Sequence, residues 1–193
     1  MTSPDPSRTS PKPDGAPVMD AAAIRGALCR IAHEIIERNP DLGAVVLAGI
    51  PSRGVEIARR LAGFVEEFQK VRIETGVIDV SMHRDDVGKR AELPMVQASH
   101  LPVPLEGRTV IIVDDVFYTG RTVRAAMDAI GTFGRPARIQ LATLIDRGHR
   151  ELPIRADYVG KNFPTAAGER VRLRLENVDN EPDAVWLIRE TTT

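Results

Sequence analysis

Two neighbouring carboxylates and a hydroxyl-rich turn are the residues of this chain whose types and order could do chemistry. Asp114 and Asp115 follow the apolar run Val110–Val113, and the segment Thr119–Thr122 leads into a helical pattern over 123–130. The apolar run predicts a strand that is buried on both faces and ends at the carboxylates. The N-terminus of a helix binds phosphate, and carboxylates accept hydrogen bonds from vicinal hydroxyls. The order therefore indicates a sugar-phosphate site at the carboxyl end of a strand.

An ordinary strand-to-helix loop is the competing interpretation. An Asp-Asp or Thr-Gly pair alone is more often such a loop with a helix cap than a binding site. The complete order of thirteen residues over 110–122 is far more specific. Because the loop has neither a P-loop ending nor a Gly-x-Gly-x-x-Gly order, both of these nucleotide-binding alternatives are weak.

A second loop of similar character lies at Gly49–Gly54, between a predicted strand and a predicted helix. Its glycines allow close backbone approach, Ser52 offers a hydroxyl group, and the planar guanidinium of Arg53 suits phosphate oxygens. Alone, the segment is equally well a tight turn. Beside the first loop it becomes a second phosphate-binding candidate.

A long polar stretch over 83–106 is either a solvated loop or a lid. It begins with the charged segment His83–Arg90 and contains prolines. A loop of this length inside a domain is often functional. Arg84, Lys89 and Arg90 could reach a ligand, and Arg84 is our candidate among them for catalysis.

Length and composition predict one ordinary domain. The chain has 193 residues and a formal net charge of −1, which excludes a bulk polycation. The single cysteine, Cys29, excludes an internal disulfide. Residues 1–17 are polar and predict a disordered tail, so the domain would span 18–193. No apolar run suggests a membrane span, and we expect a cytoplasmic protein.

Alternating strand and helix patterns predict an α/β fold: a doubly wound, mainly parallel sheet with a small antiparallel appendage. Asp20 is the expected cap of a helix that ends near Arg38. The other expected helices cover 55–68 and 121–133, and the expected strands cover 44–48, 71–82, 109–113, 138–145, 154–159, 170–176 and 184–189.

The motif at 110–122 resembles the signature of type I phosphoribosyltransferases, which bind 5-phosphoribosyl 1-pyrophosphate (PRPP). The resemblance implies that Asp114 and Asp115 hold the ribose hydroxyls, directly or through water bound to Mg²⁺, and that Thr119–Thr122 hold the 5′-phosphate. The segment Gly49–Gly54 resembles the pyrophosphate loop of the same family, in which a cis bond that does not involve proline is common. The family's flexible loop would correspond to the predicted lid.

Two further stretches narrow the resemblance to a bacterial branch of that family. Residues 27–38 and 145–163 resemble proteins that regulate pyrimidine operons by binding leader mRNA when loaded with UMP, and that also make UMP from uracil and PRPP. Members associate as homodimers or larger homo-oligomers. Cys29 and Gly26 stand where many relatives carry threonine and arginine, which puts the RNA target or its affinity in question.

The resemblance assigns roles to individual residues. Catalysis would involve Asp114, Asp115, Arg53 and Arg84. The segment after the strand at 138–145 would form the base pocket, with Asp146 and Arg147 as side chains and Val159 and Gly160 as backbone groups. Contacts to PRPP or UMP are expected from Ser52, Arg53, Asp114, Asp115, Val116, Phe117, Tyr118, Thr119, Gly120, Arg121, Thr122, Arg147 and Val159.

A basic surface for RNA is the second expectation. Arg25, Cys29 and His33 are spaced i, i+4 and i+8 and so share one helix face, although a charged helix face is usually only solvated. The resemblance extends the RNA-binding set to Arg25, Arg30, His33, His149, Arg150, Arg155 and Lys161.

Two alternatives stay open at this stage. Some purine-specific relatives place a carboxylate where this chain has Tyr118, so no obvious general base is present. A dedicated transferase for a purine base or orotate, without an RNA role, is the competing function. The sequence does not distinguish regulation through transcription termination from regulation through translation.

Overall fold

The computed structural model describes residues 16–80, 99–166 and 168–189. The predicted tail over 1–17 lies outside the described residues except for its last two positions. The predicted lid residues Arg84, Lys89 and Arg90 also lie outside them.

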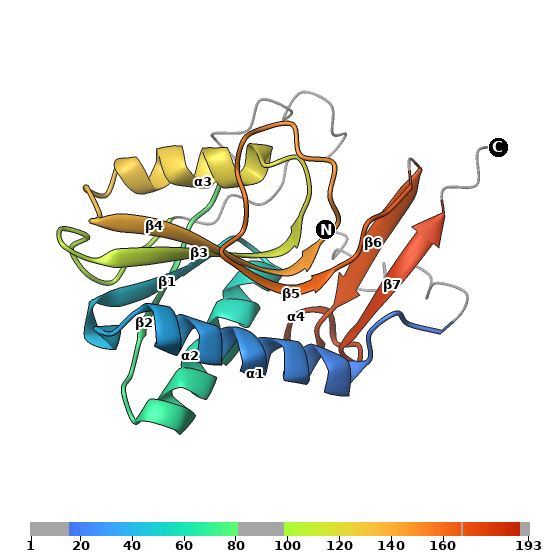
Figure 1. Ribbon diagram of the computed structural model, residues 1–193, viewed down its shortest axis with the longest axis horizontal. Coiled ribbons are helices and arrows are strands. Elements are labelled where there is room, and N and C mark those ends of the chain that lie inside the picture. The colour runs from blue at the N-terminus through green and yellow to red at the C-terminus, as the bar shows by residue number, and fades with distance from the viewer. Residues whose placement is uncertain (1–15, 81–98, 167, 190–193) are drawn as a thin grey trace, which may run out of the picture.

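Five parallel strands form a sheet in the order β2-β1-β3-β4-β5. Their bounds are Val45–Gly49 for β1, Glu74–Val77 for β2, Thr109–Phe117 for β3, Arg138–Asp146 for β4 and Tyr158–Asn162 for β5. Helices α1 (Ala21–Arg38) and α2 (Arg53–Gln69) lie on one face of the sheet, and α3 (Arg121–Gly131) lies on the other (Figure 1). The predicted doubly wound sheet is confirmed.

The central strand β3 supplies side chains to two hydrophobic cores. Ile111 and Val113 pack with α1 and α2, whereas Val110 and Ile112 pack with α3. This division follows from the pleat, because successive side chains point to opposite faces of a strand. A run of β-branched residues suits such a strand, since both of its faces need apolar side chains.

Helix α1 begins and ends where its sequence predicts. The Asp20 side chain accepts a hydrogen bond from the Ala23 backbone N–H at 2.8 Å. The expected apolar stripe, which includes Ile24 and Leu28, is buried. At the other end, the buried Asn39 amide donates to the Ile35 carbonyl at 2.9 Å and to the Tyr158 hydroxyl at 3.0 Å. The end of α1 is thereby attached to the first residue of β5.

Two strands are placed differently from the sequence-based expectation. The strand expected at 154–159 is β5 at 158–162, because Ile154 and Ala156 pack beside the α3 core and the ladder with β4 starts only at Tyr158. Of the strand expected at 71–82, positions 81 and 82 lie outside the described residues, and the described part forms a strand only at 74–77, the residues in register with β1. Alternation identifies residues that suit a strand, but the partner strand determines where pairing begins.

The C-terminal part forms the predicted appendage. Strands β6 (Glu169–Arg174) and β7 (Ala184–Arg189) pair antiparallel, and the short helix α4 (Glu176–Asp179) lies between them in the chain. A 3₁₀ turn, η1 (Leu42–Ala44), precedes β1. The appendage lies beyond the carboxyl ends of the parallel strands (Figure 1). Leu173 and Val185 bury one of its faces in the core shared with α1 and α2.

Ionic contacts hold the appendage against α2. Three α2 residues are spaced i, i+3 and i+7 and therefore lie on one side of the helix. Each of them contacts a side chain from the segment 177–183. The pairs are Arg53 with Asp179, Glu56 with Asn177, and Arg60 with Asp183.

Glu56 has the most strongly shifted carboxyl of this contact region. Burial by itself would raise the pKa of Glu56, but hydrogen bonds from Arg59, Arg60 and Asn177 lower this pKa from 4.5 to about 2. A carboxyl whose pKa is lowered by folding stabilises the folded state, and this stabilisation is complete at pH values above the pKa of the carboxyl in the unfolded chain. That stabilisation is lost as the pH falls through the folded-state pKa.

We expect Glu56→Gln to lower the free energy of unfolding by about 2 kcal/mol at neutral pH, because it removes the charge that pairs with two arginines. The difference from the unchanged protein should shrink as the pH falls from about 4.5 towards 2. Urea denaturation at several pH values measures it. Glu66→Gln, at an exposed position of the same helix, is the control. A difference that stays constant with pH would contradict the assignment.

Candidate functional site

The two predicted phosphate loops lie side by side at the point where the sheet reverses its winding. β1 and β3 are neighbours, yet the chain continues from β1 to β2 on one side and from β3 to β4 on the other. The backbone N–H of Ile50 donates to the Val113 carbonyl at 2.9 Å, which joins the loop after β1 to β3. In open α/β sheets, ligands bind in the crevice at this reversal.

Both helices that begin here lack a side-chain cap. Ser52 precedes α2 and Gly120 precedes α3, and neither position provides a side-chain cap hydrogen bond. Gly120 has φ +92°, a conformation that favours glycine. The first N–H groups of a helix have no partner within the helix, so an anion can accept from them.

The Gly49–Gly54 loop contains the expected cis peptide bond, which joins Pro51 to the nitrogen of Ser52. Its second glycine has a structural purpose that the sequence did not specify. A Cβ on Gly54 would lie 2.4 Å from the Val113 carbonyl oxygen. The close approach allowed by Gly54 is therefore between the start of α2 and the backbone of β3.

A cavity of about 280 Å³ lies at the start of α3. It gathers most of the residues that the sequence assigned to the ribose phosphate. Its lining consists of Asp114, Val116, Phe117, Tyr118, Thr119, Gly120, Arg121, Thr122, Val123 and Glu151. The Thr119 hydroxyl accepts a hydrogen bond from the Arg121 backbone N–H at 3.4 Å, within the loop itself.

The two carboxylates lie on opposite sides of β3. The strand was expected to end at Val113, but it continues to Phe117, so the pleat separates Asp114 from Asp115. Asp114 is buried and lines the cavity beside α3. Asp115 is half-buried, and its Oδ2 lies 4.0 Å from Nη1 of Arg53 at the start of α2.

The guanidinium of Arg53 is directed mainly towards Asp179 of the appendage and only in part towards Asp115. Its Nε and Nη2 donate to the two carboxylate oxygens of Asp179 at 3.0 and 2.7 Å. Burial lowers the pKa of Arg53, but the hydrogen bond and the charge of Asp179 outweigh that effect and raise it overall. The sequence predicted a phosphate-binding fork, and in this structure the fork holds a carboxylate of the appendage.

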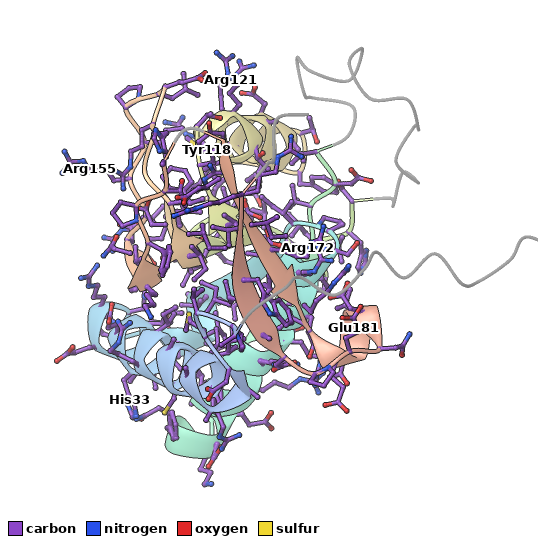
Figure 2. All side chains as sticks on the ribbon, turned by 90° about the vertical axis from the view of Figure 1, so that its right-hand side faces the viewer. His33, Tyr118, Arg121, Arg155, Arg172 and Glu181 are labelled. Atoms are coloured by element: carbon purple, nitrogen blue, oxygen red, sulfur yellow. The ribbon has the colours of Figure 1, made fainter. Side chains whose placement is uncertain are left out.

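Tyr118 is held by the loop that follows β4. The Arg147 guanidinium lies 4.1 Å from the centre of the Tyr118 ring, and the His149 ring meets Tyr118 edge-on at 5.8 Å. Arg147 also donates to the Thr165 hydroxyl at 3.0 Å and to the Glu169 carbonyl at 2.7 Å. Tyr118 and Arg121 lie on the α3 side of the molecule (Figure 2).

The same loop contains a residue that the sequence analysis missed. Glu151 lines the cavity, pairs with Arg121 at 2.8 Å, and donates its backbone N–H to the Thr119 carbonyl at 3.0 Å. Glu151 lies inside residues 145–163, the stretch that narrowed the family resemblance, so the sequence had already pointed to this segment but not to this residue. Asp146, which was expected in the base pocket, is buried and forms an ion pair with Arg150.

Val159 and Gly160 lie within β5 and are not part of the cavity lining. Their carbonyl groups accept hydrogen bonds from Nη2 of Arg30 at 3.1 and 2.5 Å. The structure therefore brings Val159 to α1, whereas Arg147 contacts the site through Tyr118.

The residues expected to bind RNA do not form one cluster in the single chain. The His33 ring stacks on Phe68 of α2 at 4.3 Å, and Arg25 lies over the Phe64 ring. His149 and Arg150 lie beside the cavity, as described above. Lys161 lies over the Phe163 ring at the end of β5. Figure 2 shows His33 and Arg155 on the same side of the molecule but well apart.

Asp114 and Asp115 are oxygen donors of the kind that Mg²⁺ prefers. Among the described residues, no three His, Cys, Asp or Glu side chains are grouped so that they could hold a metal ion. This arrangement fits Mg²⁺ that is bound mainly by substrate oxygens and water, with at most one or two protein carboxylates. Within the same described ranges, no helix is long and apolar enough to cross a membrane.

Residues 19–171 match the family model of the phosphoribosyl transferase domain. The chain is 56% identical over 176 residues to the Bifunctional protein PyrR of Roseiflexus sp. (strain RS-1). The matched region covers 91% of this chain and 96% of that protein. It is 53% identical over 171 residues to the protein of the same name from Listeria monocytogenes serotype 4b (strain CLIP80459). The matched region covers 87% of this chain and 93% of that protein.

Solved structures agree on the fold. The hypoxanthine phosphoribosyltransferase of Trypanosoma cruzi in complex with IMP superposes with a TM-score of 0.68 at 22% identity, over 90% of each chain. A hypoxanthine phosphoribosyltransferase from Staphylococcus aureus gives 0.68 at 15% identity, over 92% of this chain and 94% of that one. At these identities the likeness concerns the fold alone.

We expect Gly120→Ala to lower the free energy of unfolding by about 1–2 kcal/mol, because a Cβ disfavours the left-handed conformation before α3. Gly131→Ala is the matched control, since a Cβ there meets nothing within 4 Å. It should leave stability unchanged or raise it by up to about 1 kcal/mol. Equal effects of the two substitutions in urea denaturation would contradict the prediction.

Proposed function

The chain belongs to the phosphoribosyl transferase domain family and, within it, to the PyrR family, and on that basis we propose that it regulates pyrimidine operons and also makes UMP. As a regulator, it binds the leader mRNA of the operon when UMP is bound. As an enzyme, it is a uracil phosphoribosyltransferase that converts uracil and PRPP to UMP and pyrophosphate. It works in the cytoplasm, where its nucleotides and its mRNA occur.

The cavity beside the uncapped start of α3 is the observation that carries the proposal. It combines N–H groups and hydroxyls for the 5′-phosphate, from Thr119–Thr122, with the buried carboxylate of Asp114 for a ribose hydroxyl. Asp115 serves the other hydroxyl from the opposite side of β3. Ser52 and the start of α2 supply donors for the pyrophosphate.

The reaction replaces pyrophosphate at C1′ of the ribose. Uracil N1 forms a bond to C1′, the bond from C1′ to the pyrophosphate oxygen breaks with its electron pair, and the N1 proton passes to solvent. Positive charge develops on the sugar, so positioning and electrostatic stabilisation account for the rate. When bound, Mg²⁺ neutralises charge on the pyrophosphate, and Asp114 or Asp115 would hold it through water.

Tyr118 and Arg147 supply one wall of the base site. The Arg147 guanidinium lies 4.1 Å from the centre of the Tyr118 ring, at the chain position where some purine-specific relatives carry a carboxylate. A phenol hydroxyl is a weaker proton acceptor than a carboxylate, so we assign Tyr118 to orienting the base and not to removing its proton. Among the described residues we assign no general base to the uracil proton, which predicts modest turnover.

The RNA role is assigned to the expected basic residues, of which Figure 2 shows His33 and Arg155 on one side of the molecule. Exposed cations bind phosphates, and ring stacking such as that of His33 with Phe68 is the kind of surface on which unpaired bases stack. A homodimer or larger homo-oligomer would repeat these residues by symmetry, so two sets could serve one RNA.

We expect purified protein to form labelled UMP from PRPP, Mg²⁺ and labelled uracil. Replacing both Asp114 and Asp115 with Asn should lower kcat/KM by about 100-fold or more, because two charged hydrogen bonds to the ribose are weakened. Activity retained by the double variant would refute the assigned roles.

Base competition distinguishes this enzyme from the alternative transferase. Hypoxanthine, adenine and orotate are tested in the same assay. Turnover of one of these bases, with none of uracil, would overturn the assignment.

We expect filter binding to the pyrimidine leader RNA to be tighter with UMP than without it. Arg155→Ala should weaken the UMP-loaded complex and reduce the salt dependence of binding by about one phosphate contact. Arg138→Ala is the control, because Arg138 is exposed at the start of β4 and lies outside the set assigned to RNA. Equal affinity with and without UMP would rule out a nucleotide sensor.

A further inference from the structure

Four charged side chains connect the appendage to the ribose side of the site. Arg174 of β6 donates to Asp179 at 2.9 Å, and Asp179 accepts two hydrogen bonds from Arg53 at 3.0 and 2.7 Å. Arg53 in turn approaches Asp115 at 4.0 Å. The series therefore runs from Arg174 through Asp179 and Arg53 to Asp115.

Asp115 and Asp179 compete for one guanidinium. Asp179 receives the hydrogen-bonding edge formed by Nε and Nη2, whereas Asp115 faces Nη1 at a distance beyond a hydrogen bond. A planar guanidinium pairs bidentately with one carboxylate through a given edge, so Asp179 fixes the plane of the Arg53 side chain.

Asp179 is itself held from several sides. Its side chain is only 8% exposed, and it also accepts the backbone N–H of Leu175 at 2.8 Å. Burial would raise the pKa of Asp179, but the hydrogen bonds from Arg53, Leu175 and Arg174 lower it overall. Asp179 therefore stays charged near neutral pH and can keep Arg53 in place.

We propose that Asp179 is a positioning residue that keeps Arg53 from pairing with Asp115. This inference rests on the proposed function. When Arg53 is held by Asp179, the Asp115 carboxylate can accept a hydrogen bond from a ribose hydroxyl. Nη1 of Arg53 then faces the space beside Asp115. Without the charge of Asp179, Arg53 pairs with Asp115. The Asp115 carboxylate is then no longer available to the ribose hydroxyl.

A double-mutant cycle tests this role. Asp179→Asn keeps the size of the side chain but replaces one oxygen with an amide group that repels the guanidinium. We expect about tenfold weaker UMP binding by calorimetry and a similar rise in the KM for PRPP, with a smaller change in kcat. In an Arg53→Ala background, Asp179→Asn should change UMP affinity by less than about twofold, because no guanidinium remains to move.

Asp183→Asn is the matched control. Asp183 lies four residues away and pairs with Arg60 on the same side of α2, without contacting Arg53. It should lower thermal stability to a similar extent and leave UMP affinity and the KM for PRPP unchanged. If Asp179→Asn does not fold, Asp179→Glu replaces it. This variant keeps the charge but displaces it, and it should weaken UMP binding about threefold only when Arg53 is present.

The outcomes separate this inference from the function on which it rests. If UMP binds the unchanged protein and Asp179→Asn equally well, the inference is wrong and the function stands. The same holds if the substitution weakens binding equally with and without Arg53. An unchanged protein that neither binds UMP nor uses PRPP refutes the proposed function and this inference with it.

Discussion

The contact between the start of α2 and the backbone of β3 is the constraint on which the rest of the site depends. A Cβ at Gly54 would come within 2.4 Å of the Val113 carbonyl oxygen, so only glycine permits this approach without a backbone shift. The approach brings the loop after β1 against β3 and places Arg53 beside Asp115. Without it, the loop after β1 could not lie as close to β3.

The cavity and the proposed RNA surface are connected through one loop. The segment after β4 carries Arg147 and His149, which contact Tyr118, and Glu151, which pairs with Arg121. It also carries Arg150, which is assigned to RNA. A ligand that orders the wall of the cavity therefore acts on the same backbone that presents part of the RNA surface. This arrangement gives a physical basis for a protein that both makes UMP and responds to it.

Polar contacts hold the appendage in addition to apolar packing. One face of the antiparallel pair is buried through Leu173 and Val185, while Arg53, Glu56 and Arg60 of α2 hold the connecting segment by hydrogen bonds. Because the appendage lies beyond the carboxyl ends of the strands, these contacts determine how it stands over the site (Figure 1). The α2 residues thus take part in both the fold and the site.

The sequence by itself determined the parallel sheet, the Asp20 cap and the position of the phosphate loop, because these depend on side-chain periodicity and on turn chemistry within a few residues. Only the tertiary structure decided that β3 continues past Val113, which places Asp114 and Asp115 on opposite sides of the strand. It also decided that Arg53 holds Asp179 and that Arg30 binds the carbonyls of Val159 and Gly160. The partners in these contacts are more than a hundred residues apart in the chain. No local pattern specifies such pairs, because they form only when the packing of the sheet and helices brings the two segments together.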